Sequence, residues 1–263
     1  MSFLPAPLGG RPDAVLARTT GLTRLGAGGI WFLAAAVTID PVAPAVICLA
    51  ALVVLVLWSG LESQVVARRM GPVFIAAAGL AFVAALASPA NRDAGATVVL
   101  DLGPLHLTGP ALAGALALGL RLIAIALTSV LVFGPGDVTA FADSLVQQAR
   151  VPDRFAYGSV AALGLIPLLG ADWNSTRAAR RLRGLERRGP VGRTADVAGR
   201  LLVLLVAALR RAGRMALAMD ARGFDSGIPR GRYRPVRTGR LDAIVLSGAA
   251  GVAALALLLA RWL

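Results

Sequence analysis

Two short arginine–glycine segments are the part of this sequence best suited to bind another molecule. They are Arg183-Gly184 and Ala221-Arg222-Gly223. Glycine often ends a helix, because it adopts a left-handed conformation without a Cβ clash. An arginine in the last turn complements the negative end of the helix dipole, and its planar guanidinium suits carboxylates. The segments therefore predict two helix ends that present a cation to an acidic partner, although either one alone is also typical of an ordinary helix C-cap.

The remaining reactive side chains exclude several kinds of chemistry. The sequence contains no lysine, so the phosphate-binding GxxxxGK[ST] loop is absent. The single histidine, His106, and the single cysteine, Cys48, cannot form a metal cluster or an intrachain disulfide. HExxH and GxSxG motifs are also absent. We therefore expect a non-catalytic protein with no catalytic residue, no metal site and no cofactor.

Arg121 lies within the apolar run Leu112–Phe133. A charged side chain inside a membrane is costly and usually faces protein or water. We interpret Arg121 as a structural arginine whose side chain reaches the outer interface near the start of its helix. A contact with a substrate is the alternative.

The composition indicates an all-α, polytopic membrane protein. The chain is 57% hydrophobic and only 16% charged, whereas soluble domains carry about 25% charged residues. Apolar runs of roughly 17–25 residues can cross a bilayer as helices. About five transmembrane helices are predicted: Gly26–Ile39, Val42–Trp58, Gly71–Ala87, Leu112–Phe133 and Leu241–Leu263. The first run is short, so it either pairs tightly with the second or begins nearer Thr20.

The positive charge is concentrated in one part of the chain. Residues 150–240 contain 19 arginines and 6 acidic residues, whereas the remainder contains 8 of each, so the whole net charge of +13 lies in this block. Cytoplasmic loops of membrane proteins are enriched in basic residues. We therefore expect a multi-pass protein of the plasma membrane. Its N-terminus and the basic block should be cytoplasmic and residues 88–110 outside, and no cleaved signal peptide is predicted.

The basic block also contains two apolar runs, Phe155–Gly170 and Leu201–Leu209. The second is too short to cross a bilayer. The first, if it crossed, would move the cluster Arg177–Arg188 outside, against the distribution of charge. We therefore predict amphipathic cytoplasmic helices for this block.

Local signals divide the block into helices. One helix is predicted from about Asp172 to Arg188, with Asn174 or Ser175 as its N-cap, and another from about Ala195 to Ala221. Pro190 and Gly192 should interrupt the chain between them. The predicted organisation is an N-terminal transmembrane region with four spans (1–134), a cytoplasmic coupling domain of about three amphipathic helices (135–240) and a C-terminal transmembrane helix (241–263).

The motifs resemble those of the transmembrane T component of energy-coupling factor (ECF) transporters, the family that includes the cobalt and biotin transport permeases. Ala221-Arg222-Gly223, within Ala-Met-Asp-Ala-Arg-Gly-Phe, is similar to the Ala-Arg-Gly signature of that family. Leu182-Arg183-Gly184 departs from the signature by having leucine in place of alanine. Weaker likenesses extend the resemblance over roughly residues 20–262: Leu22–Leu25, Leu105–Thr108, Gly119–Arg121, Val151-Pro152 and Ile166-Pro167.

This resemblance implies a membrane scaffold that transmits motion. In the family, two cytoplasmic ABC-type ATPase subunits receive the two Arg-Gly helix ends, which here are Arg183-Gly184 and Ala221-Arg222-Gly223. The cytoplasmic helices transmit closure of the ATPases to a substrate-binding S component, and a vitamin or a transition-metal ion is taken up. The implied partners are therefore two ATPases, an S component and the lipid bilayer, with no nucleic acid.

A rival hypothesis is a membrane-anchored protein whose basic block binds acidic lipid or nucleic acid. Such a block would carry clustered arginines without glycine-ended helices, and nucleic-acid binders often interleave aromatic residues with the basic ones. Here apolar and basic positions alternate, and the aromatic residues are scattered. A membrane-embedded enzyme is disfavoured by the missing motifs.

Overall fold

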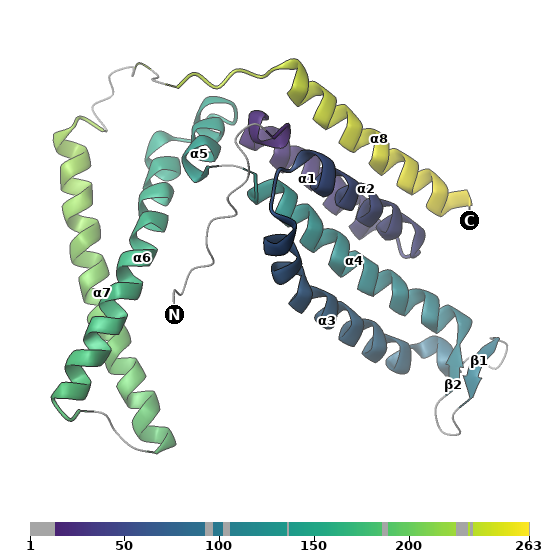
Figure 1. The fold of residues 1–263 in the computed structure, drawn as a ribbon, viewed down its shortest axis with the longest axis horizontal. Coiled ribbons are helices and arrows are strands. Elements are labelled where there is room, and N and C mark those ends of the chain that lie inside the picture. Colours follow the sequence, from purple (N-terminus) through teal and green to yellow (C-terminus); the bar gives the residue numbers. More distant parts are fainter. Residues whose placement is uncertain are drawn as a thin grey trace. The chain divides into compact units, whose positions relative to one another are not determined.

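A computed structural model describes residues 14–92, 97–101, 106–135, 137–185, 189–224, 231 and 234–262. The described chain is mainly helical (Figure 1). It divides into two compact units: a bundle unit, which includes Pro7–Ser144 and Val236–Leu263, and a hairpin unit, which includes Leu145–Pro235.

Five long helices make up the bundle unit: α1 (Gly21–Val37), α2 (Val42–Trp58), α3 (Ser63–Ala87), α4 (Gly109–Phe133) and α8 (Arg240–Trp262). Short 3-10 turns occupy Leu16–Arg18 and Pro89–Arg92. Helices α3, α4 and α8 are long and apolar enough to cross a membrane. Helices α1 and α2 have 17 residues each, at the lower limit of roughly 17–25 for a span. The predicted all-α polytopic fold is confirmed.

Two helices begin earlier than the apolar runs predicted. Helix α1 starts at Gly21 rather than Gly26, which confirms the alternative start near Thr20. Thr20 is the N-cap, and its hydroxyl accepts the amide of Thr23 at 3.3 Å. Helix α3 starts at Ser63 rather than Gly71 and continues through Pro72. Both differences have one cause: the first turns of these helices contain polar residues, so hydropathy alone places the start too late.

Helix α4 lies at the centre of the bundle unit, in contact with α1, α2 and α3, while α8 packs against α1 and α2. The interior of the bundle unit consists largely of small side chains, which allow helix backbones to approach closely. At Gly28 an added Cβ would lie 2.4 Å from Val132 Cγ2, so this position in α1 has no room for a side chain against α4.

A two-stranded antiparallel hairpin, which the sequence analysis did not predict, connects α3 to α4. It consists of β1 (Val98–Asp101) and β2 (His106–Thr108). The side chain of Asn91 donates to the carbonyl of Ala85 at 2.7 Å and accepts the amide of Thr108 at 3.0 Å. This asparagine therefore ties the end of α3 to the strand that leads into α4.

Helix α5 (Val138–Gln147) precedes the two long helices of the hairpin unit, α6 (Asp153–Leu182) and α7 (Pro190–Ala221). The predicted helix start near Asp172 is wrong, because α6 runs without interruption from Asp153 through Pro167. Asn174 and Ser175 are therefore not N-caps, and the Ser175 hydroxyl donates to the carbonyl of Asp172 at 3.0 Å within the helix. The apolar half and the basic half of this segment form one helix.

The predicted break at Pro190 and Gly192 is displaced. Pro190 is the first residue of α7, and Gly192 lies in its first turn. Proline fits the first helical position because its missing amide hydrogen would have no partner there in any case. Helix α6 is also long and apolar enough to cross a membrane. Only the distribution of charge therefore opposes a membrane span in this segment.

Candidate partner-binding helix ends

Helix α6 ends in a Schellman motif at its Arg-Gly segment. Arg183 is the C-cap and Gly184 follows with a φ of 65°, in the left-handed region. The amide of Gly184 donates to the carbonyl of Arg181 at 3.1 Å, and that of Leu185 donates to the carbonyl of Arg180 at 3.0 Å. These two bonds satisfy carbonyls that the helix itself leaves unpaired.

Helix α7 ends in the same way. Arg222 is the C-cap, and Gly223 has a φ of 70°. The amide of Gly223 donates to the carbonyl of Asp220 at 2.8 Å, and that of Phe224 donates to the carbonyl of Met219 at 3.1 Å. The two Arg-Gly segments therefore share one backbone geometry, with arginine at the C-cap and glycine directly after it.

Both arginines are exposed, as are Leu182 and Ala221 beside them. Leu182, which replaces the alanine of the signature, is 90% exposed. Within the described part of the chain, neither the Arg183 nor the Arg222 guanidinium has a hydrogen-bond or ion-pair partner. Each guanidinium is therefore available to a carboxylate of another protein.

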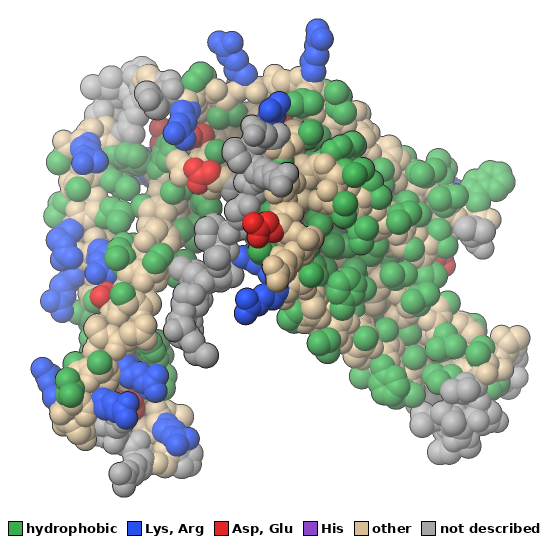
Figure 2. All heavy atoms as spheres, viewed as in Figure 1, with side chains coloured by type: hydrophobic (Ala, Val, Ile, Leu, Met, Phe, Trp, Pro, Cys, Tyr) green, Lys and Arg blue, Asp and Glu red, His purple; other side chains and the backbone are tan. Residues whose placement is uncertain are grey.

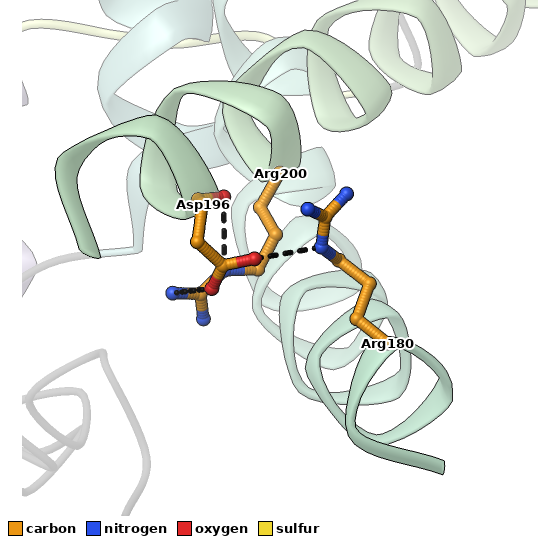
Figure 3. Close-up of polar contacts among 3 residues, drawn as sticks. All are labelled: Arg180, Asp196 and Arg200. Atoms are coloured by element: carbon orange, nitrogen blue, oxygen red, sulfur yellow. Dashed lines mark hydrogen bonds and ion pairs between the residues drawn. The ribbon is translucent and has the colours of Figure 1, made fainter. Parts of the chain in front are cut away.

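An ion-pair network joins the end of α6 to the start of α7 (Figure 3). Asp196 of α7 accepts Arg180 Nε at 2.8 Å through one oxygen, and its other oxygen lies 2.9 Å from Arg200 Nη2. The Arg200 guanidinium also lies over the ring of Trp173, 4.6 Å from its centroid. Asp196 is buried, so its charge is largely shielded from water and held between two arginines.

Further contacts show that α6 and α7 run antiparallel. Arg211 Nη1 of α7 lies 3.1 Å from Asp172 Oδ2 of α6. At the opposite end, the ring of Phe224 packs edge-on against Tyr157, with their centroids 6.3 Å apart. Early residues of α6 therefore pair with late residues of α7, and late residues of α6 with early ones of α7.

This pairing places the two Arg-Gly ends at opposite ends of the hairpin. Arg183 lies near the connection between the helices, whereas Arg222 lies beside the start of α6. Helix α7 has 32 residues, which corresponds to about 48 Å at a rise of roughly 1.5 Å per residue. The two arginines are therefore tens of ångströms apart and do not form a single binding site.

Arg121 has a structural contact within the bundle unit. Its guanidinium donates to the carbonyl of Thr38, the C-cap of α1. A cation at a helix C-terminus complements the helix dipole. Its Nε has no partner among the described residues. The contact joins α4 to the end of α1, which favours the structural interpretation of Arg121.

The surface chemistry differs between the units. Hydrophobic side chains cover most of the visible bundle unit, whereas basic side chains are frequent over α6 and α7 (Figure 2). Within the described residues, no group of three His, Cys, Asp or Glu side chains is close enough together to hold a metal ion. What the two Arg-Gly ends offer is recognition of anionic groups through arginine.

Comparison with known proteins identifies the family. The sequence profile of the cobalt transport protein family CbiQ matches residues 16–233, which include both Arg-Gly ends. The chain belongs to this family. The chain is also a multi-pass membrane protein, as its long apolar helices indicate.

Two relatives carry the name energy-coupling factor transporter transmembrane protein EcfT. The protein from Leuconostoc gelidum subsp. gasicomitatum is 26% identical over 178 residues, and the one from Limosilactobacillus fermentum is 29% identical over 164 residues. The matches cover 64% and 59% of this chain, and 66% and 61% of the relatives, slightly less than two thirds of their lengths. The resemblance to the T component of ECF transporters is thereby confirmed.

Both Arg-Gly segments are recognisable in the sequence, whereas the residues that hold the two helices together are not. Asp196 was counted only as one of the few acids in the basic block. An acidic residue four positions before Arg200 is a recognisable helix pair. The second partner of Asp196, Arg180, lies on another helix, and the sequence contained no signal for that contact.

Proposed function

We propose that this protein is the T component of an ECF-type importer, a non-catalytic membrane subunit that couples two cytoplasmic ABC-type ATPases to a substrate-binding S component. The transported substrate would be a vitamin or a transition-metal ion selected by the S component. In this proposal residues 1–134 and 241–263 form the membrane scaffold, and residues 135–240 form the cytoplasmic coupling domain with the N-terminus on the same side.

The observation that carries the proposal is the pair of Arg-Gly helix ends. Both present an exposed arginine with no partner in the described chain, and both have the same Schellman geometry. Their separation across the length of the hairpin suits two copies of one kind of partner, each receiving one end. We assign Arg183 and Gly184 to one ATPase contact, and Ala221, Arg222 and Gly223 to the other.

The proposal is tested by alanine substitution at the two arginines. Truncating one side of a desolvated charge pair typically costs about 2–5 kcal/mol of binding free energy. We expect Arg222→Ala and Arg183→Ala each to reduce recovery of the ATPases with the tagged chain in mild detergent. The double variant should abolish both recovery and substrate uptake by cells.

Arg210→Ala is the matched control, because Arg210 is exposed on α7 but lies away from both helix ends. It should retain ATPase recovery and uptake. Normal recovery and normal uptake in the Arg183→Ala/Arg222→Ala double variant would refute the assignment of these residues.

The same purification separates the proposal from the rival hypothesis. A T component should bring down ATPase subunits and a small hydrophobic protein. A membrane-anchored basic protein would instead be recovered with nucleic acid or acidic lipid, and nucleic-acid binding would weaken steeply as salt is raised.

A further inference from the structure

A large apolar cavity lies within the bundle unit, apart from the Arg-Gly helix ends. Its volume is about 530 Å³, within the range of roughly 300–1,000 Å³ typical of small-molecule sites. It lies between α1, α2, α4 and α8, and its wall includes Trp31, Val53, Leu131 and Ile244. Such a wall suits a hydrocarbon chain.

Among the described residues that line this cavity, Arg24 is the one with a charged side chain. Arg24 is only 5% exposed, and its Nε and Nη1 have no hydrogen-bond partner among the described residues. A buried charge without a partner is costly, and buried polar groups are normally hydrogen-bonded. The cavity therefore combines an apolar wall with a cation that lacks an anion.

The carboxylate of Asp242 does not supply that anion. Its Oδ1 accepts the amide of Thr20 at 2.8 Å, and its Oδ2 accepts the amide of Gly239 at 2.8 Å. No ion pair joins Asp242 to Arg24 in the described chain. Both oxygens of Asp242 are used to fix the starts of α1 and α8.

The cavity lies towards the end of the bundle unit at which lipid headgroups are expected. It is lined by the first half of α1 and of α8 and by the last turns of α2 and α4, so it lies towards one end of the bundle. The same end carries Arg68 in the second turn of α3 and Arg240 at the start of α8. Basic residues at a helix end mark the membrane–water interface, where phosphate groups lie.

We propose that this cavity binds an anionic phospholipid, with the lipid phosphate on the Arg24 guanidinium and an acyl chain along the apolar wall. Arginine matches phosphate through charge-assisted hydrogen bonds. An anionic phospholipid supplies the one charge that Arg24 lacks, whereas a zwitterionic headgroup would bring a second cation. The proposal is independent of the ATPase contacts.

The test measures phospholipid bound to the full-length chain purified in neutral detergent, after incubation with phosphatidylglycerol or phosphatidylcholine vesicles. Native mass spectrometry should detect retained phosphatidylglycerol in preference to phosphatidylcholine. Arg24→Met should reduce this retention by roughly tenfold or more, the effect expected for loss of a hydrogen bond to a charged group. Arg68→Met is the matched control: it removes an exposed arginine at the same end and should retain the lipid.

A second variant tests the apolar part of the site while Arg24 stays in place. An added Cβ at Gly248, which lines the cavity, would meet nothing within 4 Å. Gly248→Leu places a large side chain at the cavity wall and should lower phosphatidylglycerol retention. If circular dichroism and size-exclusion chromatography show that Arg24→Met does not fold, Gly248→Leu still tests the proposed lipid site.

Several results would overturn the proposal. One is that Gly248→Leu retains as much phosphatidylglycerol as the wild type. Another is that a folded Arg24→Met variant does so, and a third is that the wild type itself retains no phospholipid. If inorganic phosphate competed fully with phosphatidylglycerol, the cavity would be a site for a free anion. If oleate bound as well as phosphatidylglycerol, it would be a site for a carboxylate. Either result would contradict the proposal that the ligand is a phospholipid. ATPase recovery is not a readout here, so failure of this proposal leaves the coupling proposal unaffected.

Discussion

At the scale of single residues, glycine determines how each exposed arginine is presented. Gly184 and Gly223 turn the chain through the left-handed region directly after the C-cap arginine. An added Cβ at Gly184 would meet nothing within 4 Å, so a side chain there would be disfavoured by the backbone conformation alone. This separates the conformational role of the glycine from any packing role.

Gly184→Ala should destabilise the end of α6 by about 1 kcal/mol, because a non-glycine residue at a φ of 65° is strained. Faster hydrogen exchange at the amide of Leu185 would report the loosened end. Gly170→Ala is the control: it lies inside the same helix, where a Cβ also meets nothing within 4 Å, and alanine should stabilise the helix by about 0.5–1 kcal/mol. If Gly184→Ala and Gly170→Ala changed the stability of the helix in the same direction, backbone strain at Gly184 would not be the explanation.

Arg121→Ala should destabilise the bundle unit, because it removes the donor to the carbonyl of Thr38. The carbonyl of Thr38 is only partly buried, so the loss should lie near the lower end of the roughly 1–3 kcal/mol that an unpaired buried acceptor costs. The structural role predicts a lower melting temperature in detergent, with ATPase recovery unchanged at temperatures where the variant is folded. Loss of uptake at an unchanged melting temperature would instead support a contact with the transported substrate.

The types of the residues predicted which side chains could be functional, but not which other residues those side chains contact. The exposed Arg-Gly ends follow from helix-capping rules that need only neighbouring residues. The bond between Arg121 and Thr38 joins residues 83 positions apart, and its donor and acceptor come together only once α4 packs beside α1. The surroundings of Arg24 likewise depend on residues from four helices at once.

At the scale of elements, two ion pairs of different exposure join α6 to α7 among the described residues. The side chain of Asp196 is 11% exposed and shared by two arginines, whereas that of Asp172 is 35% exposed and pairs with one. Screening by water weakens the more exposed pair. The Asp196 network should therefore contribute most of the polar stabilisation of the helix pair.

Asp196→Ala should cost about 1.5–3 kcal/mol of stability, since it removes hydrogen bonds to charged groups and leaves two arginines facing each other. Asp172→Ala, the matched control, should cost only about 0.2–1 kcal/mol. Thermal unfolding in detergent measures both, and a double-mutant cycle with Arg180→Ala isolates the coupling to Asp196. Equal losses in the two aspartate variants would show that exposure does not distinguish the pairs.

The helices themselves were largely predictable, whereas their ends and continuity were not. Apolar runs identified α1, α2, α3, α4 and α8, since each has a long hydrophobic stretch. The sequence around Asp172 suggested a new helix because the composition changes there from apolar to basic. A change from apolar to basic residues indicates that the environment of the side chains changes, but it does not require the helix to end. The backbone of α6 continues through this change. The β1–β2 hairpin is too short to produce a periodic signal.

At the scale of the whole molecule, the positive-inside rule gives a testable orientation. Cys48 is the single native cysteine, so Cys48→Ala provides a background without thiols. In that background, Thr97→Cys should react with a membrane-impermeant maleimide in intact cells, because residues 88–110 are expected outside. Thr194→Cys, on the exposed surface of α7, should react only after permeabilisation. The reverse labelling pattern would invert the orientation and remove the basis for cytoplasmic ATPase contacts.

The paired helices α6 and α7 have a mechanical consequence. Contacts near both ends of the pair, Tyr157 with Phe224 and Arg180 with Asp196, favour motion of the two helices as one stiff rod. A rod of about 48 Å that rotates by about 5° around one end carries its other end through about 4 Å, which approaches the roughly 5.4 Å pitch of an α-helix. If the proposed partners bind the two Arg-Gly ends, a small angular change imposed at one arginine would become a displacement as large as a side chain at the far end.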